Sequence, residues 1–206
     1  TWDGTRWAVD TTGLVHEAAE CVGPCFRQLA TEYEHPKAAE ALFKWARQTE
    51  TARGIRNFLE LAQHRLSMRV DEFDVNHWRV NCPNCTLSFF GLDEAAEIPR
   101  HEPHNSADYI TKCAATPWVM GAPAPTWARF LEDILPSPEV RAFVRRAVGY
   151  SLLGSTCEQC FFVCHGGGCN GKSTFFRVIQ KTVGPDYVVQ SSPETFMQQQ
   201  GNRIRA

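Results

Sequence analysis

The sequence predicts an α+β protein, with a mainly helical N-terminal part, a small β element and then the beginning of an α/β unit. Three patterns support this prediction. Apolar residues recur at helical spacing over residues 14–66, two β-like runs flank a turn at residues 82–85, and an apolar run at 161–164 precedes a glycine-rich loop. The 206 residues, 43% hydrophobic and 21% charged, are enough for one large or two small domains and exclude a mainly disordered chain.

Composition also excludes several classes of protein. No apolar stretch approaches the about 20 residues of a membrane-spanning helix, and the first residues do not resemble a signal peptide. We therefore expect no membrane partner and a cytoplasmic location. The formal net charge of −2 argues against a protein built to coat nucleic acid. Nine cysteines without an export signal favour free or metal-bound thiols over disulfides.

The N-terminal third is expected to form a small helical bundle. Residues 5–9 alternate polar and apolar like a short strand, and a helix should follow over residues 14–29. The Gly-Pro pair at 23–24 must kink or split that helix, because proline has no amide hydrogen to donate. Two further helices are expected at residues 38–45 and 55–66.

The middle of the chain has a different pattern. Residues 78–81 and 86–90 are expected to form two strands around the turn at 82–85. The proline-rich stretch from 99 to 125 is expected to be an ordered but irregular connector. Helical spacing returns at residues 130–134, so the chain is expected to become helical again there.

A strong helix is predicted from Ser137, which can cap it, and Pro138, which suits its first turn, to Leu152. Two groups of side chains that could bind nucleic acid are interpreted as structural. The arginines of this helix are taken as a solvent-exposed face, and most of the six tryptophans as packing residues rather than stacking platforms. The arginines are Arg141, Arg145 and Arg146.

The most specific pattern is the glycine-rich loop between the apolar run and the helix after it. Residues 166–173 match G-x-x-x-x-G-K-[ST], the phosphate-binding loop. Glycines let backbone N–H groups approach a polyphosphate, and the helix N-terminus adds free N–H groups and its positive dipole end. Lys172 would contact the β- and γ-phosphates, and the Ser173 hydroxyl would complete a Mg²⁺ shell.

The predicted cofactors are therefore ATP and Mg²⁺. Lys172 and Ser173 are the predicted catalytic residues, with Ser173 reaching the metal through the nucleotide. The predicted nucleotide cradle consists of Gly166, Gly167, Gly168, Cys169, Asn170, Gly171, Lys172, Ser173 and Thr174.

These motifs resemble those of the phage and plasmid DNA primase–helicases. The similar runs include residues 130–136, 149–154 and 166–175, and Asn170 directly before the Gly-Lys-Ser triplet is typical of the superfamily 3 helicase motor. Proteins of this kind place a helical region, named for a poxvirus relative, ahead of the motor.

The resemblance implies a mainly helical, collar-like domain over residues 1–154. It implies the N-terminal part of an AAA+-like P-loop ATPase domain over residues 155–206. The implied function is that of an ATP-dependent DNA helicase or primase–helicase in phage, prophage or plasmid replication, inside a bacterial host cell. DNA and other copies of the chain, in a hexameric ring, would be its partners.

The sequence departs from that family in two respects. Cys85 stands where the family usually has glycine. Residues 173–206 contain no strand ending in paired acidic residues, no later sensor asparagine and no recognisable arginine finger. We therefore expect these 206 residues to cradle a nucleotide without hydrolysing it at an appreciable rate.

Two other functions remain open from the sequence. The chain could be a non-catalytic oligomerisation or DNA-docking module that keeps the loop as a vestige. It could also be a P-loop phosphotransferase, although the late position of the loop, after 165 residues, counts against that class.

Cysteine and histidine spacing raises the possibility of a metal site. Cys82 and Cys85 are followed by His101 and His104, and Zn²⁺ accepts a Cys₂His₂ set. The histidines are closer together than the usual spacing, so the sequence favours a plain turn and no zinc. The second C-x-x-C pair, at 157–160, is likewise expected to be neither a redox nor a metal site.

Overall fold

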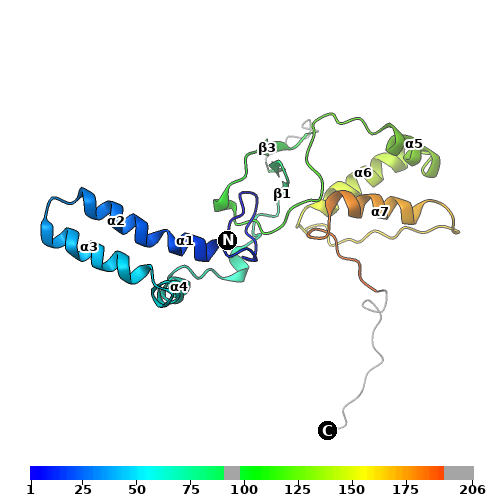
Figure 1. Cartoon of the computed structure of the whole chain (residues 1–206). Helices are drawn as coiled ribbons and strands as arrows, with labels where there is room; N and C mark the ends of the chain where they lie inside the picture. The colour runs from blue at the N-terminus through cyan, green and yellow to red at the C-terminus, as the bar shows by residue number, and fades with distance from the viewer. Residues whose placement is uncertain (91–97, 193–206) are drawn as a thin grey trace, which may run out of the picture.

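The computed structural model describes residues 1–90 and 98–192. Its elements lie in three groups along an elongated molecule: a helical arm at one end, a small sheet in the middle and three helices at the other end (Figure 1). Mainly helical structure with a small β element is therefore confirmed. Within the described ranges, no helix combines the length and the apolar content needed to cross a membrane.

The arm consists of α1 (Leu14–Glu20), α2 (Val22–Glu32), α3 (Pro36–Thr49) and α4 (Ala52–Arg65). The predicted split of the first helix is confirmed, but the break falls at Cys21 rather than at the Gly-Pro pair. Pro24 instead occupies the first turn of α2, where a missing N–H removes no helical hydrogen bond.

Gly23 of α2 lies close to the residue that follows α3. A Cβ at Gly23 would lie 2.3 Å from Cγ of Glu50, so any larger residue would have to displace the Glu50 side chain. Glu50 also forms an ion pair with Arg27 of α2. After α3 the chain turns, and Thr51 caps α4 by accepting a hydrogen bond from the Gly54 amide at 2.9 Å.

The sheet contains β1 (Arg79–Cys82), β2 (Cys85–Ser88) and β3 (Arg100–Glu102), antiparallel and in that order. The predicted hairpin is confirmed, with Cys82 opposite Cys85 at its turn. The third strand lies in the stretch expected to be irregular. The prediction of a strand at residues 5–9 is wrong, because the only β pairing of this segment is an isolated bridge between Trp2 and Trp7 among the described residues.

The main core lies on this sheet. Val80, Cys82, Cys85 and Leu87 are buried together, with half-buried side chains around them. These surrounding residues are Phe89, Ala114, Trp118 and Tyr187. A residue from beyond α7 therefore completes the core of the central sheet.

A buried polar network accompanies that core. Asn81 is fully buried, and its Oδ1 accepts hydrogen bonds from Thr86 Oγ1 at 2.9 Å and makes a 2.9 Å contact with His104 Nδ1. Its Nδ2 donates to the Thr5 carbonyl at 2.9 Å. This network ties the N-terminal segment to the sheet without leaving the Asn81 amide unsatisfied.

The third group consists of α5 (Pro125–Ile134), α6 (Pro138–Leu152) and α7 (Lys172–Val183). The cap predicted for α6 is present, since Ser137 Oγ accepts from the Val140 amide at 3.4 Å. The expected α/β unit is not observed. Residues 155–192 contain α7 and no strand, so no P-loop α/β domain is seen in this described part. Residues 193–206 of the predicted second domain lie outside it.

Candidate functional site

The candidate loop lies between α6 and α7. The apolar run at 161–164, predicted as a buried strand, is irregular, and Phe161 and Val163 are 85% and 75% exposed. A strand needs neighbours to accept its hydrogen bonds, and the one described sheet, β1–β3, does not reach this run. The strand prediction is therefore wrong, while the helix predicted after the loop is confirmed as α7.

The loop backbone turns through the left-handed region at three residues. Gly168, Cys169 and Gly171 have φ values of +97°, +46° and +80°. Glycine adopts such angles without strain, but cysteine does so only where its surroundings hold it. Cys169 therefore lies in a constrained turn, with its side chain exposed to solvent.

The Lys172 side chain folds back across this turn. Its Nζ donates to the Gly166 carbonyl at 3.2 Å and to Asn170 Oδ1 at 2.7 Å. A Cβ at Gly166 would lie 2.0 Å from Asn170 Nδ2 and 3.0 Å from Lys172 Nζ. A larger residue at position 166 would have to displace the Asn170 side chain, so glycine permits this arrangement of the loop.

The N-terminus of α7 carries no side-chain cap. Its first intrahelical bond runs from the Phe175 amide to the Gly171 carbonyl at 2.9 Å, so the three preceding amides have no partner within the helix. Ser173 and Thr174, in this first turn, are exposed. Free N–H groups and the helix dipole make such an end attractive to anions.

Helix α5 supports the loop from the other side. A Cβ at Gly171 would lie 2.7 Å from Ile134 Cγ2, which shows how closely the two segments approach. Further along α7, the Phe175 ring stacks on Trp127 with centroids 5.7 Å apart. A cavity of about 270 Å³ borders the loop, and its lining includes Lys172 as well as apolar residues of α5 and α7.

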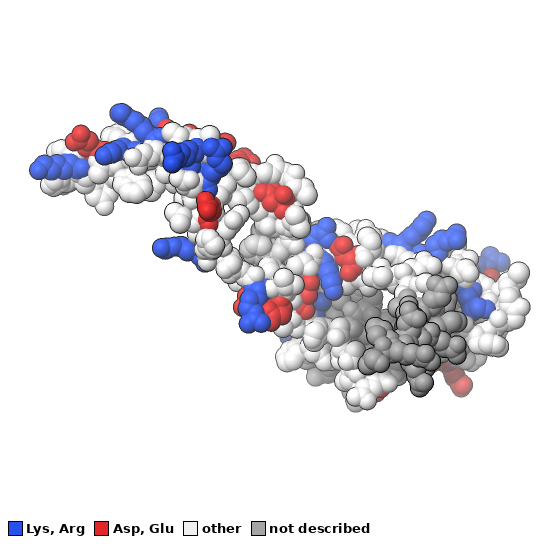
Figure 2. Space-filling view, turned by 90° about the horizontal axis from the view of Figure 1, so that it is seen from below, with Lys and Arg blue, Asp and Glu red and all other residues white. Residues whose placement is uncertain are grey.

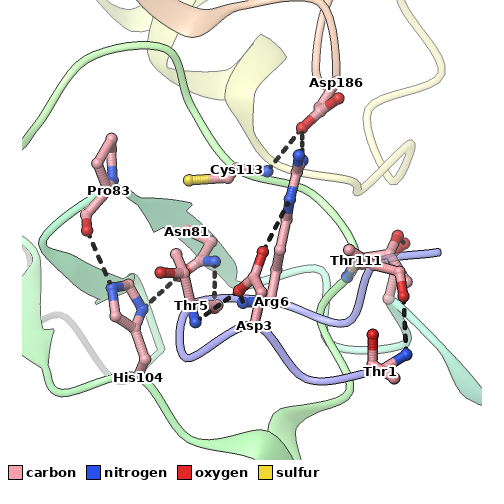
Figure 3. Close-up of polar contacts among 12 residues, drawn as sticks. Thr1, Asp3, Thr5, Arg6, Asn81, Pro83, His104, Thr111, Cys113 and Asp186 are labelled. Carbon is pink, nitrogen blue, oxygen red and sulfur yellow. Dashed lines mark hydrogen bonds and ion pairs between the residues drawn. The ribbon is translucent and has the colours of Figure 1, made fainter. Parts of the chain in front are cut away.

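The far end of α7 is bonded to the connector that follows β3. The Val183 carbonyl accepts from the Ala115 amide at 3.2 Å. Asp186 Oδ2 accepts from the Cys113 amide at 3.1 Å and forms an ion pair with Arg6, as Figure 3 shows. Sequence reasoning missed this anchor, since Arg6 and Asp186 lie 180 positions apart and no local pattern connects them.

Of the predicted site residues, the structure joins Gly166, Asn170 and Lys172 through direct contacts. Gly167 and Gly168 have open space around them, and Ser173 only shares the first turn of α7. Asp186, the first acidic residue after the loop, is paired with Arg6. It is therefore not positioned beside Lys172.

The candidate zinc residues are only partly assembled. Cys82 and Cys85 face each other across the turn, and burial raises the pKa of the Cys82 thiol to about 11 and also raises that of Cys85. His104 makes its close contact with Asn81, and His101 is exposed on β3. Among the residues described, no group of three or more His, Cys, Asp or Glu could hold a metal ion. The absence of zinc from this site stays a prediction.

Three other expectations can be compared with the structure. Arg141 does not belong to a free face, because its Nη1 donates to the carbonyls of Leu135 and Pro136 at 2.7 and 2.9 Å. Trp45 is 59% exposed and is therefore an exception among the tryptophans, most of which are expected to be packing residues. The pair at 157–160 is exposed beside Tyr150, and its role is untested.

Comparison with known proteins identifies the arm, the sheet and α5. These elements form the N-terminal region found in primase–helicases of the poxvirus D5 type. A family model described as "D5 N terminal like" matches residues 1–136, and the chain belongs to this family. The match ends before the loop at 166–174. Among curated proteins, none matches the chain.

Proposed function

We propose that the chain binds ATP with Mg²⁺ through residues 166–174 and acts within an ATP-dependent DNA primase–helicase. The observation that carries this proposal is the position of the Lys172 ammonium, inside the loop on the Gly166 carbonyl and Asn170 Oδ1. Hydrogen bonds from an ammonium to an anion are stronger than those to neutral oxygens. An arriving phosphate would therefore draw Lys172 from these two oxygens.

The surroundings of the loop fit a polyphosphate. The uncapped end of α7 supplies free amides, and no Asp or Glu of the described residues forms an ion pair with Lys172. Mg²⁺, bound with the nucleotide, would neutralise charge on the β- and γ-phosphates. The exposed Ser173 hydroxyl is the side chain of this chain that would reach it.

The proposed cellular role rests on the family. Membership in the D5 N-terminal family supports DNA replication of a phage, prophage or plasmid as the setting, in the cytoplasm of a bacterial host. DNA and a hexameric ring of identical chains are the proposed partners. The loop lies outside the matched residues, so nucleotide binding depends on the loop itself and is tested separately.

A second candidate, a non-catalytic assembly or docking module, draws support from the acidic residues that follow the loop in sequence. Asp186 is paired with Arg6, and residues 173–206 hold no acidic pair in sequence. A missing arginine finger alone is worth about 10³–10⁵ in rate. We therefore expect the 206-residue chain to bind ATP and to hydrolyse it no faster than background.

Nucleotide binding is tested by titrating the chain with a fluorescent ADP analogue in the presence of Mg²⁺. Replacing Lys172 with alanine should weaken binding about 10-fold or more, since a hydrogen bond to a charged group contributes about 1.5–3 kcal/mol. Lys181→Ala, which removes an equal charge from the last turn of the same helix, should leave the affinity within about twofold. Equal affinities of the wild type and Lys172→Ala would overturn the proposal.

A further inference from the structure

Charge is divided unevenly between the two halves of the arm. Residues 14–34, which include α1 and α2, hold one Lys or Arg and four Asp or Glu. Residues 36–65, spanning α3 and α4, hold six Lys or Arg and three Asp or Glu. Lys and Arg gather along the projecting arm in Figure 2. The α3–α4 segment is thus positive in a chain whose net charge is −2.

The cations of this segment are available to a partner. None of the six forms an ion pair with any residue in the described ranges, whereas Glu50, one of the three acidic residues, is neutralised by Arg27 of α2. The six are Lys37, Lys44, Arg47, Arg53, Arg56 and Arg65. The electrostatic fields of unpaired cations add together, so these side chains would attract a polyanion.

Exposed aromatic side chains accompany these cations. Trp45 is 59% exposed, and Phe43 and Phe58 are 39% and 41% exposed. Among the described residues, none of the three contacts another ring. The rings of α5–α7 behave differently, since Trp127, for example, stacks on two neighbours. Part of each of these three side chains is therefore accessible to solvent.

Helix geometry interleaves the two kinds of side chain on α3. Successive residues are about 100° apart around a helix, so Phe43, Lys44 and Trp45 spread over about 200° of its circumference. Lys37, Glu40 and Arg47 fall within that arc, so three cations and one carboxylate lie between the two aromatic positions. The inner face of α3, around buried Ala46, lies on the opposite side of the helix from this arc.

We infer that this surface of α3 is a binding site for single-stranded nucleic acid. Lysine and arginine would neutralise phosphates, and Trp45 and Phe43 would stack on bases. Paired bases are already stacked and keep their faces from such side chains, which favours a single strand over a duplex. The site shares no residue with the loop at 166–174. It builds on the proposed role with DNA and assigns that partner a surface on the arm.

The test is fluorescence anisotropy with labelled dT25 and rU25 at several NaCl concentrations, without nucleotide. The variant Lys37→Ala/Lys44→Ala/Arg47→Ala should weaken binding roughly 10–100-fold and reduce the slope of log K against log salt by about 2. Trp45→Ala should weaken binding about tenfold while leaving that slope unchanged. The two variants therefore separate phosphate contacts from stacking.

Matched controls keep the inference falsifiable. Arg129→Ala/Arg146→Ala/Arg177→Ala removes three exposed arginines from α5–α7 and should keep the affinity within about twofold. Lys172→Ala should leave it unchanged, so failure of the nucleotide proposal would not affect this result. Tighter binding of dT25 assigns DNA to the site, tighter binding of rU25 assigns RNA, and equal binding assigns backbone and stacking recognition.

Three outcomes would overturn the inference. The first is no binding of either oligonucleotide at 50 mM NaCl with about 10 μM protein, where even nonspecific binding falls in the micromolar range. The second is an equal loss in the control triple variant. The third is a change of oligomeric state in the α3 triple variant alone, measured by light scattering, which would assign the surface to contact between copies.

Discussion

Seven of the eight residues of β1 and β2 are buried, whereas α5 and α6 bury none. Both regions have apolar side chains in the expected pattern. The hairpin is covered by the connector after β3 and by Tyr187, while α6 leaves Phe143 52% exposed. An amphipathic pattern thus predicts a face that can be buried, and only the surrounding chain determines how far it is buried.

This difference bears on the proposal of nucleotide binding. The sheet lies within the residues that match the D5 N-terminal family, and its core is closed by residues of this chain. The candidate loop lies outside the matched residues and beside α5 and α6, which have no buried residues. Its conformation depends on local contacts with α5 and on the anchor at the end of α7.

The largest expected effect comes from removing volume from each region. Leu87→Ala should lower the free energy of unfolding by about 2–5 kcal/mol, because it leaves a cavity in the buried core. Phe143→Ala should lower it by less than about 1 kcal/mol, because the ring is half exposed. Urea denaturation followed by tryptophan fluorescence measures both, and similar effects would contradict the comparison.

A smaller effect is expected from alkaline pH. Burial raises the pKa of Tyr187 from 10.0 to about 12, so above pH 10 the unfolded state loses this proton before the folded state does. Stability from this group is complete below pH 10 and should fall as pH rises from 10 to 12. Tyr187→Phe should flatten the decline in the urea midpoint, whereas Tyr33→Phe, an exposed control, should not. An unchanged decline in Tyr187→Phe would exclude this tyrosine as the cause.

The smallest change to the molecule is alkylation of its thiols. Cys169 is exposed in the loop, whereas Cys82 and Cys85 are buried and have raised pKa values. Iodoacetamide should therefore label Cys169 well before the two sheet cysteines in the native protein. Mg-ADP should slow labelling at Cys169 and leave exposed Cys21 unaffected, as measured by peptide mass spectrometry. Equal protection of Cys21 would show that the nucleotide effect is not local.

Local patterns predicted the elements that depend on nearby residues. The helices of the arm, the hairpin at 82–85 and the Ser137 cap of α6 follow from periodicity, turn residues and capping. The third strand, Arg100–Glu102, was missed because three polar residues carry no β pattern and pair only with β2. The strand at 161–164 was predicted wrongly because an apolar run indicates burial without supplying a neighbour.

The candidate site shows the same division. Gly166, Gly171 and Lys172 could be named from their spacing, and the structure supplies the reasons that glycine is needed at two of them. The contact of Gly171 with Ile134 and the pairing of Asp186 with Arg6 could not be predicted, because each joins segments distant in sequence. Exposure of Trp45 also depends on which helices cover α3.

The anchor at the end of α7 has a mechanical consequence. A helix of 12 residues is a stiff rod of about 18 Å, with Lys172 at one end and the bonded Val183 carbonyl at the other. Gly184, at φ +86° and packed against Ala115, is the joint at which this rod meets the rest of the chain. If the loop moves, α7 must therefore either rotate about Gly184 or move the segment that follows β3 in the same direction. Arg6 would then move with that segment.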